Sequence, residues 1–410
     1  MKKKKIAVVG AGAAGAAAAI NAAREGAEVV VFEKQESLGR KIAASGNGLC
    51  NISNLEISYK NYNGDNPRFV QNIFGRFSLE STRSFFLSLG LPWRERQQGR
   101  LYPYSLQART VCDVLLDGVI RAGCEIKFHR CVESISYSKN DKFTIITAGK
   151  EKYLFDSVIL ACGGKSFAGL GGSDRGYHLA ISLGHSVTEL VPAIVPLNIH
   201  DKSLRRLEGI KWDVALTAII DGKKKDFSTG EILFTKYGIS GPVTLDISGT
   251  VNRALTSNKT AEIHLDLFPD FSHEQLLTFI KSISDDRTII KTLETVLKKR
   301  MPEFFLSHLK IAPSRKANSI KESELLQLVD IFKGHILVPG EPRPFAEAVV
   351  TSGGVPVSEV YPNSCESKIV NGLYIVGELL DIDGDCGGYN LQFAWSSGAV
   401  AGRAASKPSS

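Results

Sequence analysis

The sequence lacks the cysteine pattern of a disulfide-stabilised protein or of a dithiol redox centre. Its 410 residues include seven cysteines, an odd number, and no two of them are spaced as C-x-x-C or C-x-x-x-x-C. This set argues against a disulfide framework and against a redox-active thiol pair. Because such cysteine usage is typical of a reducing compartment, we expect a cytoplasmic protein without disulfide bonds.

Long apolar runs, a strong charge of one sign and metal-binding spacings are missing as well. No stretch approaches the roughly 20 consecutive apolar residues that span a bilayer, so we expect no membrane contact. The net charge of +7, from 50 basic and 43 acidic residues, is modest, and basic residues do not alternate with aromatic ones. This pattern argues against a nucleic-acid partner. The eight histidines form no H-E-x-x-H motif and no other pair at a spacing typical of metal ligands, so we predict no metal site.

A complete βαβ pattern stands near the start of the chain. An apolar run leads into G-x-G-x-x-G, formed by Gly10, Gly12 and Gly15, and a second apolar run ends at Glu33, 18 positions after Gly15. Gly10 permits a tight turn, Gly12 lets the backbone approach a pyrophosphate, and Gly15 allows close packing of the helix on the sheet. The N-terminus of that helix offers free N–H groups to phosphate. The pattern predicts a dinucleotide site with Glu33 at the adenosine ribose.

Two further segments favour FAD as the dinucleotide. Residues 34–54 form a Gly/Ser/Asn-rich loop that is suited to wrapping a ligand, and it carries Arg40 and Lys41, which can pair with phosphate. Near the other end, an apolar run over 372–377 leads through a Gly/Asp turn into a small-residue helix over about 393–405. This turn supplies a second helix N-terminus. Two such features at opposite ends of the chain suit an extended FAD molecule.

The middle of the chain follows a different pattern. A length of 410 residues exceeds a single compact core. We expect residues 1–192 and 346–410 to be the first and second parts of one FAD-binding domain, and residues 193–345 to form an insert. Within the insert the patterns predict strands over 212–220, 231–234 and 261–266, and helices over 273–284, 288–300 and 323–332.

Several motifs together resemble the YhiN/BaiN-type family of NAD(P)/FAD-dependent oxidoreductases, also called the aminoacetone oxidase family. They include GAGAAG (10–15), GRKIAASGNGLCNISN (39–54), LACGG (160–164), VTSGGV (350–355) and GELLDIDGDCGGYNLQFAWSSGAVAG (377–402). The resemblance covers essentially the whole chain. It implies an α/β fold: a Rossmann-like, two-dinucleotide-type FAD-binding domain, with a parallel sheet and a small antiparallel meander, and an inserted domain that is β-barrel-like and helical.

The motifs and the resemblance together assign the residues that bind FAD, which we expect to be held non-covalently. No catalytic acid or base stands out. The expected cofactor-binding residues are Gly10, Gly12, Ala13, Ala14, Gly15, Glu33, Lys34, Arg40, Lys41, Ser45, Gly46, Asn51, Val132, Ala161, Gly163, Gly377, Glu378, Asp381, Gly388, Asn390 and Leu391.

The expected activity is an FAD-dependent oxidoreduction of a small organic substrate, with NAD(P)H-linked reduction favoured. An amine oxidase or dehydrogenase that uses oxygen or another acceptor is one alternative, and a flavin-containing RNA-modification or binding protein is another. No second G-x-G-x-x-G occurs, so NAD(P)H, if it is the electron donor, has no Rossmann domain of its own.

Overall fold

The computed structural model describes residues 3–138 and 142–407 and divides into two compact units. Unit 1 comprises Met1–Leu190 together with Val349–Ser410, and unit 2 comprises Val191–Ala348. Unit 1 is therefore assembled from both ends of the chain, and each unit has its own hydrophobic core. Among the described helices, none combines the length and apolar character that a bilayer-spanning segment needs.

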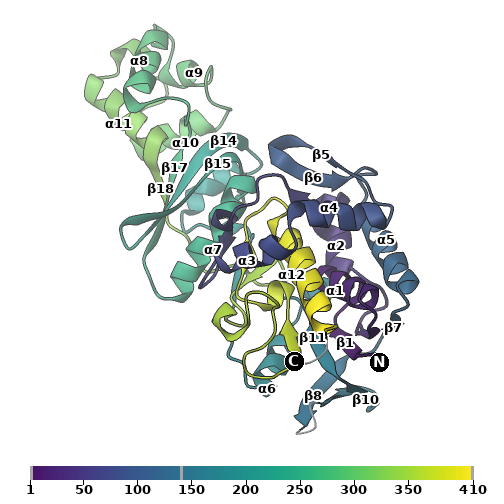
Figure 1. The fold of residues 1–410 in the computed structure, drawn as a ribbon. Helices are drawn as coiled ribbons and strands as arrows, with labels where there is room; N and C mark the ends of the chain where they lie inside the picture. The colour runs from purple at the N-terminus through teal and green to yellow at the C-terminus, as the bar shows by residue number, and fades with distance from the viewer. Residues whose placement is uncertain (1–2, 139–141, 408–410) are drawn as a thin grey trace. The chain divides into compact units, whose positions relative to one another are not determined.

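A five-stranded parallel sheet forms the centre of unit 1 (Figure 1). Its β-branched strands are buried almost throughout, as in sheets covered on both faces. The strand order is β20 (Leu373–Ile375), β11 (Ser157–Leu160), β1 (Lys5–Val9), β2 (Glu28–Phe32) and β7 (Glu125–Lys127). The helices of unit 1 are α1 (Ala13–Arg24), α2 (Arg40–Ala44), α3 (Phe69–Arg76), α4 (Leu79–Ser88), α5 (Ala108–Arg121), α6 (Arg175–Ser182) and α12 (Tyr389–Ala405).

Small antiparallel sheets complete unit 1. The expected meander is present as the three-stranded sheet β10-β9-β8. These sheets are β8 (Val132–Ser138) with β9 (Lys142–Thr147) and β10 (Lys152–Phe155); β3 (Ser53–Asn54) with β6 (Arg100–Pro103) and β5 (Trp93–Glu95); and β4 (Tyr62–Asn63) with β21 (Asp383–Gly384). Unit 1 also contains the short strand β19 (Val350–Ser352).

Helices α1 and α12 lie side by side although they come from opposite ends of the chain (Figure 1). Glycines make this close packing possible. A Cβ atom at Gly398 would lie 2.2 Å from the carbonyl oxygen of Ala14, and one at Gly402 would lie 2.3 Å from that of Ala18. The Ala/Gly spacing of the last helix therefore brings the C-terminal segment against the first βαβ unit, beside the predicted dinucleotide site.

Unit 2 contains a six-stranded antiparallel sheet that closes on itself like a barrel. The strands follow the order β13 (Leu197–Asn198), β16 (Gly238–Ser240), β15 (Lys223–Thr235), β14 (Lys211–Ile220), β17 (Ala261–Asp266) and β18 (His335–Leu337). Closure comes from segments next to the two end strands: the amide of His200 donates to the carbonyl of Val338, and the amide of Gly340 donates to that of Asn198. Strand β12 (Val191–Ala193) precedes this sheet in the chain.

The helices of unit 2 differ from the expected ones at two places. The expected helix over 288–300 is shorter, because α9 ends at Leu293 and a new helix begins at Met301, with Pro302 in its first turn, a position that proline tolerates. Helix α7 begins at Pro242 after Gly241 and was not among the expected helices. The helices are α7 (Pro242–Thr256), α8 (His273–Ile283), α9 (Ile289–Leu293), α10 (Met301–His308) and α11 (Glu322–Gly334).

Candidate dinucleotide site at the edge of the parallel sheet

The predicted site residues of unit 1 gather at one edge of its parallel sheet. Gly10 follows β1, Glu33 follows β2, Ala161 follows β11 and Gly377 follows β20. Because all these strands are parallel, their carboxyl ends meet at the same edge. From β1 the chain adds β2 and β7 on one side of the sheet, and it then adds β11 and β20 on the other side of β1. Ligands of open α/β sheets bind outside the strand ends at such a switch point, which here lies between β1 and β11.

The glycine turn after β1 contains two glycines that close packing requires, Gly10 and Gly15, and one, Gly12, that lies beside open space. A Cβ atom at Gly10, where φ is +106°, would lie 2.5 Å from the carbonyl oxygen of Ala161, and one at Gly15 would lie 1.9 Å from that of Gly10. By contrast, apart from Gly12's own chain neighbours and the adjoining helix backbone, no heavy atom of the described residues lies within 4 Å of the Cβ position at Gly12. Gly12 is the N-cap of α1, and the first-turn amides of Ala13 and Ala14 belong to the unpaired donors of a helix start. This open, donor-lined space fits a pyrophosphate.

Glu33 is fixed beside this turn. Its Oε2 accepts a hydrogen bond from the amide of Ala11 at 2.8 Å, and its Oε1 accepts one from the amide of Gln35 at 2.8 Å. The neighbouring Lys34 donates from Nζ to Oγ of Ser173 at 2.8 Å. A carboxylate held in this way at the end of β2 suits the hydroxyl groups of a ribose.

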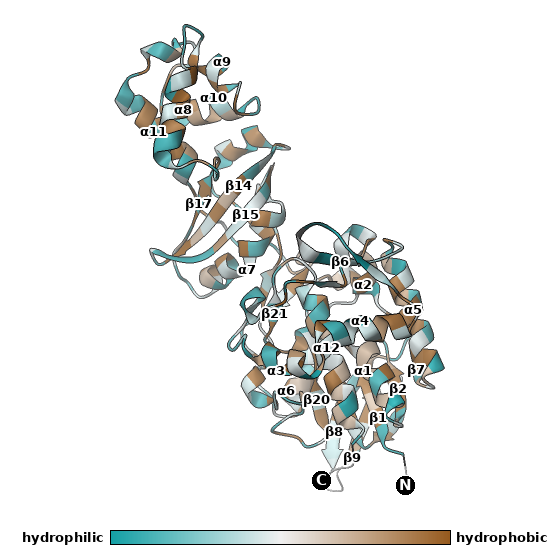
Figure 2. Ribbon diagram, turned by 45° about the horizontal axis from the view of Figure 1, so that its top comes forward, coloured by the Kyte–Doolittle hydropathy of each residue, from teal (hydrophilic) through white to brown (hydrophobic). Residues whose placement is uncertain are grey.

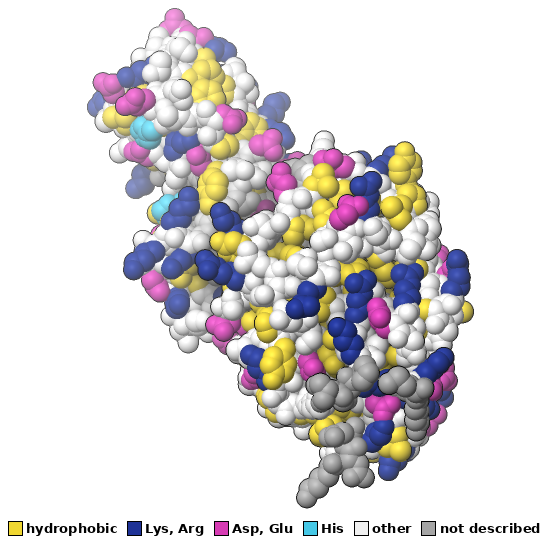
Figure 3. All heavy atoms as spheres, in the orientation of Figure 1, with side chains coloured by type: hydrophobic (Ala, Val, Ile, Leu, Met, Phe, Trp, Pro, Cys, Tyr) yellow, Lys and Arg dark blue, Asp and Glu magenta, His cyan; other side chains and the backbone are white. Residues whose placement is uncertain are grey.

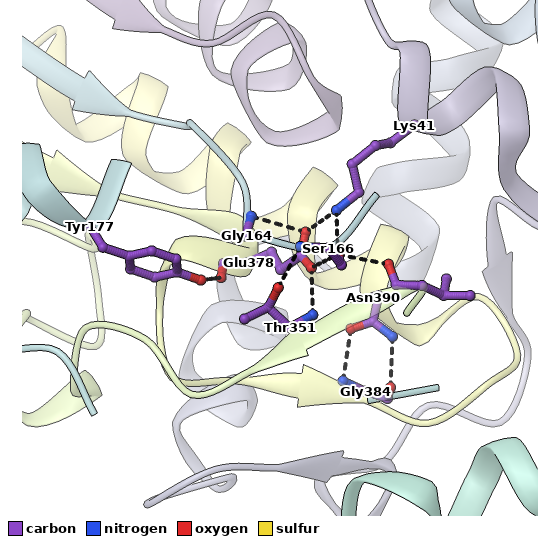
Figure 4. Close-up of polar contacts among 9 residues, drawn as sticks. Lys41, Gly164, Ser166, Tyr177, Thr351, Glu378, Gly384 and Asn390 are labelled. Atoms are coloured by element: carbon purple, nitrogen blue, oxygen red, sulfur yellow. Dashed lines mark hydrogen bonds and ion pairs between the residues drawn. The ribbon is translucent and has the colours of Figure 1, made fainter. Parts of the chain in front are cut away.

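A polar network surrounds the Glu378 carboxylate, which lies just after β20 (Figure 4). Its Oε2 accepts from Lys41 Nζ at 2.6 Å and from the amide of Gly164 at 3.2 Å. Its Oε1 accepts from the amide of Thr351 at 2.8 Å and from Ser166 Oγ at 3.0 Å. The network therefore ties together α2, the loop after β11, β19 and the turn after β20.

These contacts keep Glu378 ionised. Burial on its own opposes the charged form of the carboxyl group, but Lys41 and the backbone donors outweigh it and hold the pKa of Glu378 below its usual value. The Lys41 cation is thus already paired with a carboxylate. Its expected contact with phosphate stays a prediction, and in this structure its partners are Glu378 and Ser166.

The start of α12 forms the other side of the site. Asn390 closes the preceding turn, because its Nδ2 donates to the carbonyl of Gly384 at 2.6 Å and its Oδ1 accepts from the Gly384 amide at 2.8 Å (Figure 4). Gly388 has a φ of +97°, and a Cβ atom there would lie 2.5 Å from the carbonyl oxygen of Ser53 and 2.8 Å from Oδ1 of Asn51. That Oδ1 atom is buried and has no hydrogen-bond partner among the described residues. An orphaned acceptor beside a helix N-terminus fits a ligand that brings a donor.

The remaining predicted residues occupy the loops around these contacts. Arg40 donates to Oε1 of Gln35 at 2.7 Å and to the carbonyl of Gly169 at 3.3 Å. Ser45 Oγ donates to the carbonyl of Ile42 at 2.7 Å. The others lie as follows: Gly46 and Gly163 adopt positive φ, Val132 is buried at the start of β8, Asp381 accepts from Thr188 Oγ1 at 3.2 Å, and Leu391 is half-buried in the first turn of α12.

Sequence reasoning did not single out the hydroxyl partners of Glu378. Ser166 and Thr351 are far from Glu378 in the sequence, although VTSGGV (350–355), which contains Thr351, is among the motifs that indicated the family. The hydroxyl of Tyr177 also donates to the backbone carbonyl of Glu378, at 3.4 Å. Near the same site, burial raises the pKa of the Cys50 thiol to about 12. Cys50 is therefore a packed thiol at neutral pH and not a reactive thiolate.

Known proteins resemble this chain over nearly its whole length. The family model for the HI0933-like protein Rossmann domain matches residues 4–404. The chain is 35% identical over 408 residues to the 3-dehydro-bile acid delta(4,6)-reductase of Clostridium scindens, covering 98% of this chain and 99% of that protein. It is 31% identical over 394 residues to a ribosomal RNA dihydrouridine synthase of Haemophilus influenzae, covering 95% of each. The solved 3-ketosteroid delta1-dehydrogenase of Sterolibacterium denitrificans has a related fold, with a TM-score of 0.53 at 12% identity over 99% of this chain and 100% of that one.

Proposed function

The chain belongs to the HI0933-like family and is an FAD-dependent oxidoreductase, and from that premise we propose that it uses NAD(P)H to reduce a carbon–carbon double bond conjugated to a carbonyl group in a small organic substrate. The observation that carries this proposal is the match over nearly the whole chain with the bile acid reductase. A 3-dehydro bile acid with delta(4,6) unsaturation and a uracil ring both present such a conjugated double bond. The two curated relatives therefore point to one kind of reduction on two very different substrates.

FAD supplies the hydride-transfer chemistry when it is bound, and the protein positions the cofactor and tunes its environment. The open space at Gly12, the first-turn amides of α1 and the fixed carboxylate of Glu33 support binding of the adenosine diphosphate half. The orphaned Oδ1 of Asn51 and the N-terminus of α12 support binding of a second, hydrogen-bonding part of the ligand. The positive end of the α12 dipole favours negative charge on that part.

The Lys41–Glu378 pair serves as a positioning element in this proposal. The two side chains are 29% and 19% exposed and hold four separate chain segments at the carboxyl edge of the sheet. Because they neutralise each other at 2.6 Å, the pair adds little net charge beside the dinucleotide. Its main contribution is therefore to the shape of the site.

The test starts from the reduced enzyme. The protein is reduced anaerobically with NADPH or NADH and then mixed with a steroid acid that carries a 3-oxo-delta(4,6) dienone. We expect flavin reoxidation together with a product that has gained two hydrogen atoms by mass spectrometry. If neither nucleotide reduces the flavin but an amine does, the enzyme is an amine oxidase or dehydrogenase and the reductase proposal is wrong.

A second candidate substrate is a uracil base in ribosomal RNA. The match with the dihydrouridine synthase supports it, as does a basic hairpin in unit 2. Figure 3 shows Lys and Arg side chains gathered near the tip of the β14–β15 hairpin, where Lys223, Lys224 and Lys225 are exposed. The neighbouring residue Phe227 is 50% exposed, and Lys224 Nζ lies 4.3 Å from the centroid of its ring. An exposed aromatic ring among cations is a feature of single-stranded RNA binding.

The two substrates are distinguished by one pair of assays. The NADPH-reduced enzyme is offered the dienone steroid acid in one and unmodified ribosomal RNA in the other. If RNA is the substrate, only the RNA reoxidises the flavin. Substitution of Lys223, Lys224 and Lys225 by glutamate then weakens RNA binding in a salt-dependent manner. If the small-molecule reading holds, the triple variant reduces the steroid at the wild-type rate.

A further inference from the structure

Three metal-ligating side chains from distant parts of the sequence meet within unit 2. Asp201 directly precedes the 3-10 helix at Lys202–Leu207, His308 is the last residue of α10, and His335 is the first residue of β18. Each side chain offers one ligand atom, and these atoms all lie within 4.8 Å of one another. The residues are 107 and 27 positions apart, so no sequence motif signals the cluster.

Asp201 and His308 face each other in a way that requires a positive charge between them. Nδ1 of His308 lies 2.9 Å from the backbone carbonyl of Phe304, which can only accept, so Nδ1 carries a proton. In the neutral ring, Nε2 then presents a lone pair, and it lies 3.5 Å from Oδ2 of Asp201. Two such acceptors repel unless a proton or a metal ion lies between them. Two ligands bound at about 2.1 Å to tetrahedral zinc are separated by about 3.4 Å, which is close to the observed 3.5 Å.

His335 supplies the third ligand and an independent observation. The residue is 9% exposed, and its Nε2 is buried and has no hydrogen-bond partner among the described residues. The rings of Phe304 and Phe305 lie at centroid distances of 5.8 and 5.5 Å, so the imidazole sits against an apolar wall. Nothing among the described residues satisfies this buried nitrogen, so it is available as a ligand to a metal ion.

The Asp201 carboxylate is already oriented for this role. Its Oδ1 accepts from the amide of Ser203 at 2.8 Å, and its Oδ2 accepts from Ser203 Oγ at 2.8 Å. Likewise, the Phe304 carbonyl fixes the tautomer of His308. Outer hydrogen bonds of this kind orient the ligands of known metal sites.

We propose that Asp201, His308 and His335 form a binding site for one Zn²⁺ ion, with water at the open coordination position. Two imidazoles and one carboxylate are a donor set that suits zinc. Ligand atoms that now lie up to 4.8 Å apart would have to approach one another by about 1.4 Å to reach the separation found around tetrahedral zinc. The bound ion cross-links a strand, a helix end and a turn of unit 2. This site lies outside the dinucleotide site and does not depend on the proposed reaction.

The test uses untagged, full-length protein that has been treated with a chelator and then titrated with Zn²⁺ by calorimetry. We expect one Zn²⁺ per chain, and a loss of affinity of about tenfold or more in His308→Gln and in Asp201→Asn. The matched control is His273→Gln, because His273 forms an exposed pair with Asp330 at 2.6 Å. This control should bind Zn²⁺ as the wild type does.

Circular dichroism spectra and flavin content identify any variant that fails to fold. Because Asp201→Asn keeps the shape of the side chain, it tests the site even if a histidine variant unfolds. A second readout is thermal unfolding, which Zn²⁺ should shift upward in the wild type and in His273→Gln but much less in Asp201→Asn. The proposal would be overturned if the wild type did not bind Zn²⁺ stoichiometrically. It would also be overturned if Asp201→Asn and His308→Gln bound Zn²⁺ with the affinity of the wild type.

Discussion

The parallel sheet of unit 1 and the antiparallel sheet of unit 2 bring polar groups together in different ways. In the parallel sheet of unit 1 every strand ends at the same edge, so the short loops that follow these strands meet there. In unit 2 neighbouring strands run in opposite directions, and the long strand β15 alternates between exposed and covered positions and starts with hydrophilic residues (Figure 2). A parallel sheet therefore assembles a ligand site from its strand ends. In unit 2, by contrast, the cluster of Asp201, His308 and His335 is built from single side chains on unrelated elements.

The largest effect should come from the glycine that holds the first βαβ turn of unit 1 together. In Gly15→Ala, the new Cβ would lie 1.9 Å from the carbonyl oxygen of Gly10. We expect the free energy of unfolding to fall by about 3 kcal/mol or more, because backbone has to move. Urea unfolding measures this change. The control is Gly75→Ala in α3, where the Cβ meets no described atom within 4 Å. Equal stability of the two variants would show that the turn is not packed as described.

A neighbouring glycine should affect the ligand and leave the fold intact. In Gly12→Ala, the Cβ enters the open space at the start of α1, so we expect an unfolding midpoint close to that of the wild type. FAD affinity should fall about tenfold or more, which corresponds to about 1.4 kcal/mol. Reconstitution of the apoprotein with FAD, followed by flavin fluorescence, measures this change. An FAD affinity equal to that of the wild type would contradict the placement of the pyrophosphate.

The charged network at Glu378 should have an intermediate effect that depends on pH. Glu378→Gln leaves Lys41 without its carboxylate, so we expect a loss of about 2 kcal/mol in unfolding free energy at pH 7. The pKa of Glu378 is lowered by folding, so its stabilising contribution is present above about 4.5 and is lost as the pH falls through the lowered folded-state pKa.

The difference between wild type and Glu378→Gln should therefore shrink in acid. Urea titrations at neutral and acidic pH measure it, and Glu36→Gln is the matched control, since Glu36 is 69% exposed and lies 3.8 Å from Arg40. A difference that is independent of pH would mean that the Glu378 charge does not stabilise the fold.

The smallest effect is expected in unit 2, at an exposed ion pair. Asp330→Asn removes the partner of His273, and the two side chains are 67% and 43% exposed. Solvent screens this pair, so the unfolding free energy should change by no more than about 0.5 kcal/mol. A change as large as that of Glu378→Gln would mean that this exposed pair of unit 2 stabilises the fold as strongly as the charged network at Glu378 in unit 1.

The same contrast explains how much could be predicted from the sequence. The glycine turn and Glu33 lie within about 24 residues of one another, and backbone rules link each of them to a place on the sheet. The partners of Glu378 could not be found in that way, because Ser166 and Thr351 meet it only after the loop that follows β11, strand β19 and the turn after β20 have come together.

Unit 2 was predicted less completely than unit 1. Strand patterns located β14 and β17 within about a residue, but the start of α7 was missed because Gly241 and Pro242 indicate a turn as readily as a helix start. Likewise, the prediction that the chain has no metal site rested on spacing alone. The cluster of Asp201, His308 and His335 forms only through tertiary packing.

The central claim, a dinucleotide site for FAD at the carboxyl edge of the parallel sheet, is tested most directly by the absorbance spectrum of the purified protein during anaerobic titration with NADPH. We predict flavin bands from one FAD per chain, release of that FAD on denaturation, bleaching by the nucleotide, and loss of bound flavin in Gly12→Ala. A colourless protein that cannot be reconstituted with FAD would contradict this account.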